Sequence, residues 1–379
     1  MKKFLLIPDS FKGTMSSLEI CAIMADVLAE HFPSAEIRSI PVADGGEGTV
    51  DAFLTAMGGE KVFLTVTGPL GDPVDAFYGR IGDTAIIEMA AAAGLPLIPG
   101  QLDPEGATTY GVGELMRHAL AHGAAHLVVG LGGSATTDGG CGAAAALGVR
   151  FYNAAGEAFV PVGGTLKDIA AIDLSRRDPA LDTAEVVTMC DISNPLTGPQ
   201  GAAFVFSPQK GADEAAVERL NAGLVHLAAV VRTRLHREIE TMPGAGAAGG
   251  MGGGMAAFLD SRLEMGIETV LNTVGFDALL QGTSLVFTGE GKIDSQSLGG
   301  KVVIGVAQRA KAQKVPVIAV VGDIGDPIEA AYDRGVTGIF SINRVAVPYT
   351  QAKPRAKEDL RRTMDNLCRL LKSLPALPH

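Results

Sequence analysis

The sequence has no tryptophan, few other aromatic residues and a deficit of basic side chains. Aromatic residues make up 5% of the 379 positions, and 31 lysines and arginines stand against 42 aspartates and glutamates, which gives a formal net charge of −11. An acidic chain without a basic stripe or tryptophan is a poor candidate for binding nucleic acid. An anionic ligand would therefore have to be bound by local features, such as loops rich in backbone N–H groups.

Cysteines are also scarce, and long apolar runs are missing. The four cysteines form no Cys-x-x-Cys pair and lie in apolar contexts, which predicts free, buried thiols in a reducing compartment. No stretch of 18 uncharged apolar residues is present, so no membrane span is expected. The first apolar run stops at Pro8-Asp9 and is too short for the core of a signal peptide. We therefore expect a cytoplasmic protein without a membrane partner.

Strand and helix patterns alternate along the chain, which indicates an α/β fold. Short apolar runs near both ends are typical of buried parallel strands. They lie at 4–8, 36–42, 284–287, 315–321 and 338–342. A capping box at Ser16-Ser17-Leu18-Glu19 predicts a helix to about residue 30, and apolar residues at helical spacing predict a last helix at 356–373.

The middle of the chain differs from the two ends. Segments 62–67, 75–81 and 85–89 are β-rich and separated by turn residues, which predicts an antiparallel meander. We expect residues 1–60 and 276–379 to form a flavodoxin-like domain with a parallel sheet that is discontinuous in sequence. Residues 61–275 would form an inserted mixed α/β domain, and we expect the active site in the cleft between the two.

Glycine is the abundant residue of this sequence, with 49 copies that gather in short clusters. Five clusters stand out. Four of them follow predicted strands and contain carboxylates or hydroxyls, and ligands bind at the carboxyl ends of strands in open parallel sheets. In the cluster at 8–14, Lys12 either neutralises a phosphate or carboxylate or is a solvated lysine at a helix entry. In the cluster at 41–49, Asp44 and Glu47 either hold Mg²⁺ or position a hydroxyl, or else Asp44 caps a helix with Glu47 in its first turn. Three neighbouring glycines favour a ligand.

The cluster at 130–140 precedes a predicted helix. Its exposed N–H groups and hydroxyls predict an anion site. The candidate residues for binding a cofactor here are Gly132, Gly133, Ser134 and Thr136.

The cluster at 243–254 contains a Gly-x-Gly-x-x-Gly match formed by Gly244, Gly246 and Gly249. A dinucleotide fingerprint needs a preceding parallel strand and an acidic residue after the next strand, and neither is expected here. We interpret the segment as a loop that cradles an anion, with a glycine-packed turn as the alternative.

The cluster at 288–301 combines lysines, carboxylates and hydroxyls, a composition that suits phosphate and Mg²⁺ although it is not a Walker A sequence. Glu290 and Asp294 are its candidate metal ligands, and Lys292 is a candidate for cofactor binding. Asp191 follows another predicted strand and precedes Asn194-Pro195, so it is either a general base or part of an Asx turn. Phosphate cradles, a carboxylate for Mg²⁺, a cation and a base are together the requirements of phosphoryl transfer.

The same segments, taken in order, resemble successive signatures of the bacterial glycerate kinase family. They are 8–13, 41–49, 132–136, 190–196, 243–250 and 288–301. The resemblance covers nearly the whole chain and implies ATP and Mg²⁺ as cofactors. It implies phosphorylation of D-glycerate to 2-phosphoglycerate in glycerate, glyoxylate or sugar-acid catabolism, and a two-domain α/β fold.

Within this resemblance, we expect Asp191 to accept the proton of the attacking hydroxyl. Lys12 would face the transferring phosphoryl group or the glycerate carboxylate, and Asp44 with Glu290 or Asp294 would hold Mg²⁺. Three alternatives stay open: a kinase that yields 3-phosphoglycerate, an NAD-dependent oxidoreductase, and a non-catalytic protein that binds a small acid. The oligomeric state, monomer or homodimer, is also open.

Overall fold

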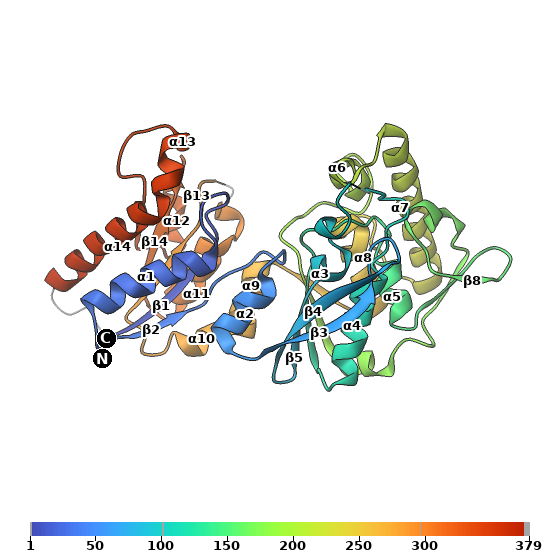
Figure 1. Cartoon of the computed structure of the whole chain (residues 1–379), viewed down its shortest axis with the longest axis horizontal. Helices are drawn as coiled ribbons and strands as arrows, with labels where there is room; N and C mark the ends of the chain where they lie inside the picture. Colours follow the sequence, from blue (N-terminus) through green and yellow to red (C-terminus); the bar gives the residue numbers. More distant parts are fainter. Residues whose placement is uncertain (1, 101, 296, 375–379) are drawn as a thin grey trace. The chain divides into compact units, whose positions relative to one another are not determined.

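The computed structural model describes residues 2–100, 102–295 and 297–374. The chain divides into two compact units. Unit 1 comprises residues 1–43, 51–58 and 270–379, and unit 2 comprises residues 44–50 and 59–269. Helices α2 (Thr49–Met57) and α9 (Gly266–Thr273) lie where the chain passes from one unit to the other (Figure 1).

Unit 1 is built on a five-stranded sheet with the order β2-β1-β12-β14-β16, in which all neighbours are parallel. The strands are β1 (Lys3–Pro8), β2 (Glu36–Ser39), β12 (Leu285–Gly289), β14 (Val317–Val321) and β16 (Gly338–Ser341). Two strands from the start of the chain and three from its end therefore form one sheet, in the order of a flavodoxin-like fold. The predicted fold class, with a discontinuous parallel-sheet domain and an inserted mixed domain, is confirmed.

Helices and short turns complete unit 1. Its helices are α1 (Ser17–His31), α10 (Phe276–Leu279), α11 (Val302–Ala312), α12 (Ala330–Asp333), α13 (Tyr349–Ala352) and α14 (Ala356–Ser373). Two short strands, β13 (Lys292–Ile293) and β15 (Asp323–Ile324), pair with each other, and η5 (Ser297–Gly299) and η6 (Lys353–Arg355) are single 3₁₀ turns. The capping box predicted at the start of α1 is present. The Ser16 hydroxyl accepts a hydrogen bond from the Glu19 N–H, and the Glu19 carboxylate accepts one from the Ser16 N–H.

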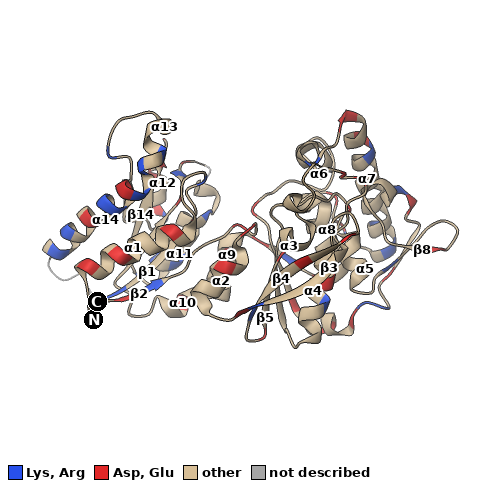
Figure 2. Cartoon of the chain, in the orientation of Figure 1, with Lys and Arg blue, Asp and Glu red and all other residues tan. Residues whose placement is uncertain are grey.

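The core of unit 1 follows from the period-two alternation of strand side chains. Phe4 and Leu6 of β1 lie in one buried cluster with residues of α1 and α14, such as Met24 and Leu360. The outward face of α14 carries interspersed acidic and basic residues (Figure 2), and several of these form ion pairs four positions apart, such as Glu358 with Arg362. The amphipathic pattern that predicts helix 356–373 is therefore confirmed.

Unit 2 is built on a six-stranded mixed sheet with the order β11-β10-β6-β5-β4-β3. The strands are β3 (Glu60–Thr67), β4 (Pro73–Ile81), β5 (Thr84–Glu88), β6 (His126–Gly130), β10 (Glu185–Met189) and β11 (Arg262–Glu264). The first three form the predicted antiparallel meander, and β5, β6, β10 and β11 are parallel. A small antiparallel sheet joins β7 (Arg150–Tyr152), β8 (Ala158–Phe159) and β9 (Ala171–Asp173).

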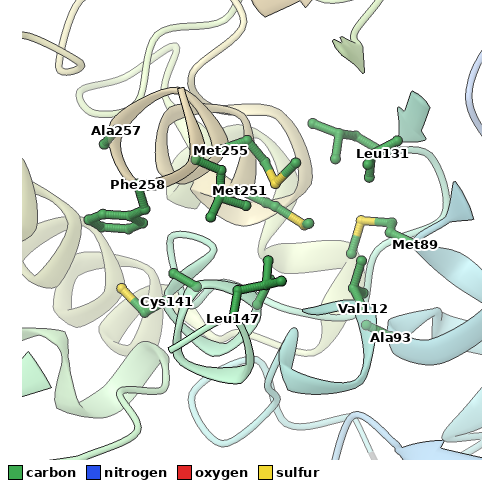
Figure 3. Close-up of a cluster of buried hydrophobic side chains, with 14 of the residues drawn as sticks. Met89, Ala93, Val112, Leu131, Cys141, Leu147, Met251, Met255, Ala257 and Phe258 are labelled. Atoms are coloured by element: carbon green, nitrogen blue, oxygen red, sulfur yellow. The ribbon is translucent and has the colours of Figure 1, made fainter. Parts of the chain in front are cut away.

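Helices surround an apolar interior in unit 2, part of which Figure 3 shows. They are α3 (Ala90–Ala93), α4 (Tyr110–Ala121), α5 (Cys141–Ala146), α6 (Ala202–Phe206), α7 (Glu214–Leu235) and α8 (Ala247–Leu259). The 3₁₀ turns are η1 (Leu95–Leu97), η2 (Gly163–Asp168), η3 (Pro179–Asp182) and η4 (Pro208–Lys210). In the three ranges that the structure describes, no helix is both long and apolar enough to cross a membrane.

One helix begins earlier than its sequence suggests. The glycine run at 244–254 predicts a helix only after its end, but α8 already starts at Ala247. Its first turn is interrupted at Ala248, Gly249 and Gly250, which adopt left-handed backbone conformations. The run is helical beyond this kink because its glycines are buried against neighbouring backbone, which compensates for their low helix propensity.

Candidate active site

In unit 1, the segments that follow β1 and β12 lie side by side at the carboxyl edge of the sheet. Pro8 pairs with Gly289, and the Asp9 N–H donates to the Gly289 carbonyl at 2.8 Å. The segment after β14 joins them, since the Gly322 N–H donates to the Glu290 carbonyl at 3.1 Å. The strand ends thus collect the predicted site residues of this unit, which are Lys12, Glu290, Lys292 and Asp294.

Glu290 is the buried acid of this group. It is 6% exposed, and among the described residues its Oε1 is buried without a hydrogen-bond partner. Its pKa is raised to about 7, mainly by burial and also by the negative charges of Asp9 and Asp294. A hydrogen bond with Ser297 and the charge of Lys301 partly oppose this shift. A buried acid with an unsatisfied oxygen and two carboxylates close by suits a cation.

These carboxylates do not form a complete metal cage. Across the described ranges, no group of three or more His, Cys, Asp or Glu side chains is arranged to hold a metal ion. Mg²⁺ commonly takes one or two protein carboxylates together with substrate phosphates, so the set fits this cation. Asp44, the third predicted ligand, belongs to unit 2, and its joint role with Glu290 or Asp294 stays a prediction. Gln296, part of the same signature, lies outside the described residues.

In unit 2, three neighbouring parallel strands end at one level, because Glu88, Gly130 and Met189 are paired in register. The segment 44–50 runs against these ends. The Gly132 N–H donates to the Gly45 carbonyl at 2.9 Å, and the Val50 N–H donates to the Glu88 carboxylate at 2.6 Å. The second and third glycine clusters are therefore in direct contact.

The fourth cluster packs against the third. The Gly139 N–H donates to the Gly249 carbonyl at 3.1 Å, and a Cβ on Gly249 would overlap the Thr136 carbonyl oxygen. A Cβ on Gly254 would likewise overlap the Gly139 carbonyl oxygen. Gly244 and Gly246 are also buried, and the Gly246 N–H donates to the Asn194 carbonyl at 3.1 Å. These glycines thus allow backbones to approach closely, as in the glycine-packed turn, and anion binding by this segment stays a prediction.

We expect Gly249→Ala to lower the free energy of unfolding by about 3 kcal/mol or more, because it combines overpacking with a left-handed backbone. The matched control is Gly82→Ala in the same unit. The φ of Gly82 is +60°, close to the +65° of Gly249, and no described atom lies within 4 Å of the position that a Cβ would take. The control should lose about 1 kcal/mol. Urea denaturation measures both, and equal losses would show that close packing at Gly249 contributes nothing.

Asp191 lies directly beyond β10, in an exposed position. Its Oδ1 accepts the N–H of Gly266, at the start of α9, at 2.6 Å. A neighbouring segment thus helps to orient this carboxylate. Asp191 emerges next to the strand that leads into Gly132 and Gly133, so the predicted base and the predicted anion loop leave adjacent strands of one sheet.

Three buried groups near these loops escaped the sequence analysis. Glu88 carries no local signal beyond its place at a strand end. Asp138 is fully buried, and burial raises its pKa despite hydrogen bonds from Thr109, Gly140 and Gly142. Lys210 lies outside every glycine cluster, yet its ammonium group donates to Ser134 and Thr136. Only the tertiary structure brings Glu88 and Lys210 to these loops. Asp138 lies within the cluster at 130–140, and only the folded structure shows that its side chain is buried.

Comparison with known proteins adds a direct observation. A sequence profile described as the Glycerate kinase family matches residues 4–372. The chain belongs to the glycerate kinase family. It is therefore an enzyme, a kinase, and the Gly-x-Gly-x-x-Gly match of this kinase follows helix α7 instead of the parallel strand that a dinucleotide fold requires.

Individual relatives of this kinase match along almost their full length. A glycerate kinase of Bacillus cereus is 44% identical over 373 residues, which are 98% of each chain. A glycerate 2-kinase of Escherichia coli K12 is 42% identical over 377 residues, 99% of this chain and 97% of its own. The crystal structure of a candidate glycerate kinase 2 from Salmonella typhimurium LT2 has a TM-score of 0.86 and 42% identity, with 98% of each chain covered.

Proposed function

We propose that this kinase transfers the γ-phosphoryl group of ATP to the 2-hydroxyl of D-glycerate and yields 2-phosphoglycerate, in glycerate, glyoxylate or sugar-acid catabolism. Relatives named glycerate kinase support the acceptor, and the Escherichia coli relative named glycerate 2-kinase supports the position. The four cysteines are free and buried, which agrees with a role in the reducing cytoplasm.

The observation that carries the proposal is the chemistry of the two sets of strand ends. Unit 1 offers a buried acid, Glu290, in one group with Lys12 and Lys292, which suits a nucleotide bound with a cation. Unit 2 offers Asp191 on the strand next to the hydroxyl-rich loop that follows β6, which suits a hydroxy acid. Phosphoryl transfer needs both kinds of group, because its catalysis consists largely of positioning and charge stabilisation.

Asp191 is the proposed general base. It accepts the proton of the attacking hydroxyl, and the hydrogen bond from Gly266 orients its carboxylate for that transfer. Lys12 is exposed and faces the transferring phosphoryl group or the glycerate carboxylate. Backbone N–H groups of the loops 132–138 and 244–250 hold anionic groups, and Lys292 contributes to binding ATP.

Glu290 and Asp294 are the proposed ligands of Mg²⁺ in unit 1, and the role of Asp44 as a ligand stays a prediction. Among the described residues, the buried Oε1 of Glu290 has no hydrogen-bond partner, which supports this assignment. When bound, Mg²⁺ supplies positive charge that stabilises the oxygens of the transferring phosphoryl group.

Phosphorus NMR of the reaction product tests the proposal. Purified enzyme is incubated with ATP, Mg²⁺ and D-glycerate, and the proton-coupled spectrum of the product is recorded. A phosphate on the 2-position couples to one proton and gives a doublet, whereas a phosphate on the 3-position couples to two and gives a triplet. A triplet would favour 3-phosphoglycerate, and the absence of any phosphorylated glycerate would refute the proposed acceptor.

A further inference from the structure

A buried lysine supports the loop that follows β6. Lys210, the last residue of η4, is 2% exposed. Its Nζ donates to the Thr136 carbonyl at 2.6 Å and to the Ser134 hydroxyl at 3.2 Å. The ammonium group therefore binds the segment Gly132–Thr137, here called the anion loop, from its buried side.

The segment that carries Lys210 is itself fixed against the anion loop. The buried hydroxyls of Ser207 and Thr137 are 3.2 Å apart. Gly211, which ends η4, has a φ of +100°, and a Cβ there would lie 2.6 Å from the Cβ of Leu102. The backbone on both sides of Lys210 is thus held in place, so its ammonium group has little freedom to leave the loop.

Burying this lysine has an energetic cost. The pKa of Lys210 is lowered to about 7 by desolvation, and the charge of Asp138 offsets part of this effect. Asp138 is bound by backbone N–H groups at the start of α5 and by Thr109. The other groups that contact the ammonium, Ser134 and Thr136, are neutral. An apolar residue of similar size would fill the same space without this cost.

We propose that Lys210 is a positioning residue of this kinase, whose ammonium group holds the anion loop in the conformation that binds the carboxylate of the acceptor. The inference rests on the proposed function, because it takes glycerate as the acceptor and Asp191 as its base. The anion loop follows β6, and β6 is paired with β10, which Asp191 follows by two residues, so the loop is on the same sheet edge as the base. A positive charge beneath the loop also favours an anion above it, since a buried charge is weakly screened.

The charge of Lys210 has a direct consequence for the hydroxyl groups of the loop. An ammonium group only donates hydrogen bonds, so the Ser134 oxygen must accept from it. The Ser134 hydroxyl hydrogen is then directed elsewhere, and Thr136, whose Oγ1 is 3.2 Å away, is within reach. Loss of the proton from Lys210 would give the amine a lone pair that can accept the Ser134 hydroxyl hydrogen. The fixed direction of this hydrogen bond and the positive charge would then be lost together.

The test measures KM for D-glycerate and for ATP in Lys210→Met, Lys210→Arg and the wild type. We expect Lys210→Met to raise KM for D-glycerate about tenfold or more, as for the loss of a charge-assisted hydrogen bond, with KM for ATP unchanged. Lys210→Arg should recover part of this loss. The matched control is Lys167→Met, a lysine near the end of another 3₁₀ turn that is exposed, and it should change neither constant.

A pH profile separates this role from simple packing. In the wild type, KM for D-glycerate should rise above about pH 7 as Lys210 loses its proton, whereas Lys210→Arg should stay flat and Lys210→Met should be high throughout. If a variant fails to fold, the pH dependence of KM in the wild type still tests the inference. A flat wild-type profile, a normal KM in Lys210→Met, or a change confined to ATP would overturn the inference. Failure of the wild type to phosphorylate glycerate would instead refute the proposed function.

Discussion

Replacing Asp191 with asparagine is expected to lower kcat by about 10²- to 10⁴-fold, the range attributed to a general base. Asparagine has nearly the same shape and keeps an oxygen that can accept the Gly266 N–H. The substitution therefore removes the capacity to take a proton while it leaves the local hydrogen bond in place. Steady-state turnover with ATP and D-glycerate measures the loss, and thermal unfolding checks that the fold is intact.

Asp173→Asn is the matched control for this experiment. Asp173 ends β9 in the same unit, and its Oδ1 accepts the Ser175 N–H at 2.8 Å, so it too is a carboxylate at a strand end that binds one backbone amide. It lies on the small sheet and not at the ends of β5, β6 and β10. We expect normal turnover in this variant. Near-normal turnover in Asp191→Asn would remove Asp191 as the base.

The centre of the sheet of unit 1 was predictable because β1, β12 and β14 are short apolar runs with burial on both faces. Strand β1 is a clear example, with five consecutive buried residues that end at Pro8-Asp9. The capping box at Ser16 and the apolar spacing in 356–373 are equally local signals, and both helices are present. Local patterns of this kind survive in the tertiary structure because nothing in it opposes them.

The glycine clusters show where sequence alone stops. Their density predicts close approach of something to the backbone, but it does not say of what. In this structure Gly249 approaches the backbone of Thr136, and Gly132 approaches that of Gly46. The lack of a side chain allows close approach of a ligand and of another backbone segment equally well. Only the fold shows that these glycines contact other segments of the backbone.

Lys210 could not be predicted as a site residue for a related reason. Its neighbours in sequence, Gln209 and Gly211, form no recognised motif, and a lysine is exposed in most sequence contexts. Its importance depends on burial and on contacts with residues more than 70 positions away. A sequence shows charge, whereas desolvation is a property of the folded chain.

Replacing Glu290 with glutamine is expected to change stability and activity in opposite directions. The folded pKa of about 7 lies above the ordinary glutamate pKa of 4.5, so the folded, metal-free chain holds a proton that the unfolded chain loses between these values. The free energy of unfolding therefore falls as the pH rises from about 4.5 to 7, and the loss persists above pH 7. A neutral glutamine removes this dependence, and at pH 8 it should stabilise the chain by up to about 3 kcal/mol, at 1.36 kcal/mol per pKa unit.

The gain in stability should come with a loss of function. Without the carboxylate, unit 1 loses its buried ligand, and we expect kcat/KM to fall about 100-fold or more, as for removal of a preorganised charged group at a transferring phosphoryl. Mg²⁺ with ATP should raise the Tm of the wild type but not that of Glu290→Gln. Glu358→Gln, on the exposed face of α14, should change none of these properties. If Mg²⁺ with ATP raised the Tm of both proteins equally, Glu290 would not be a ligand of the metal.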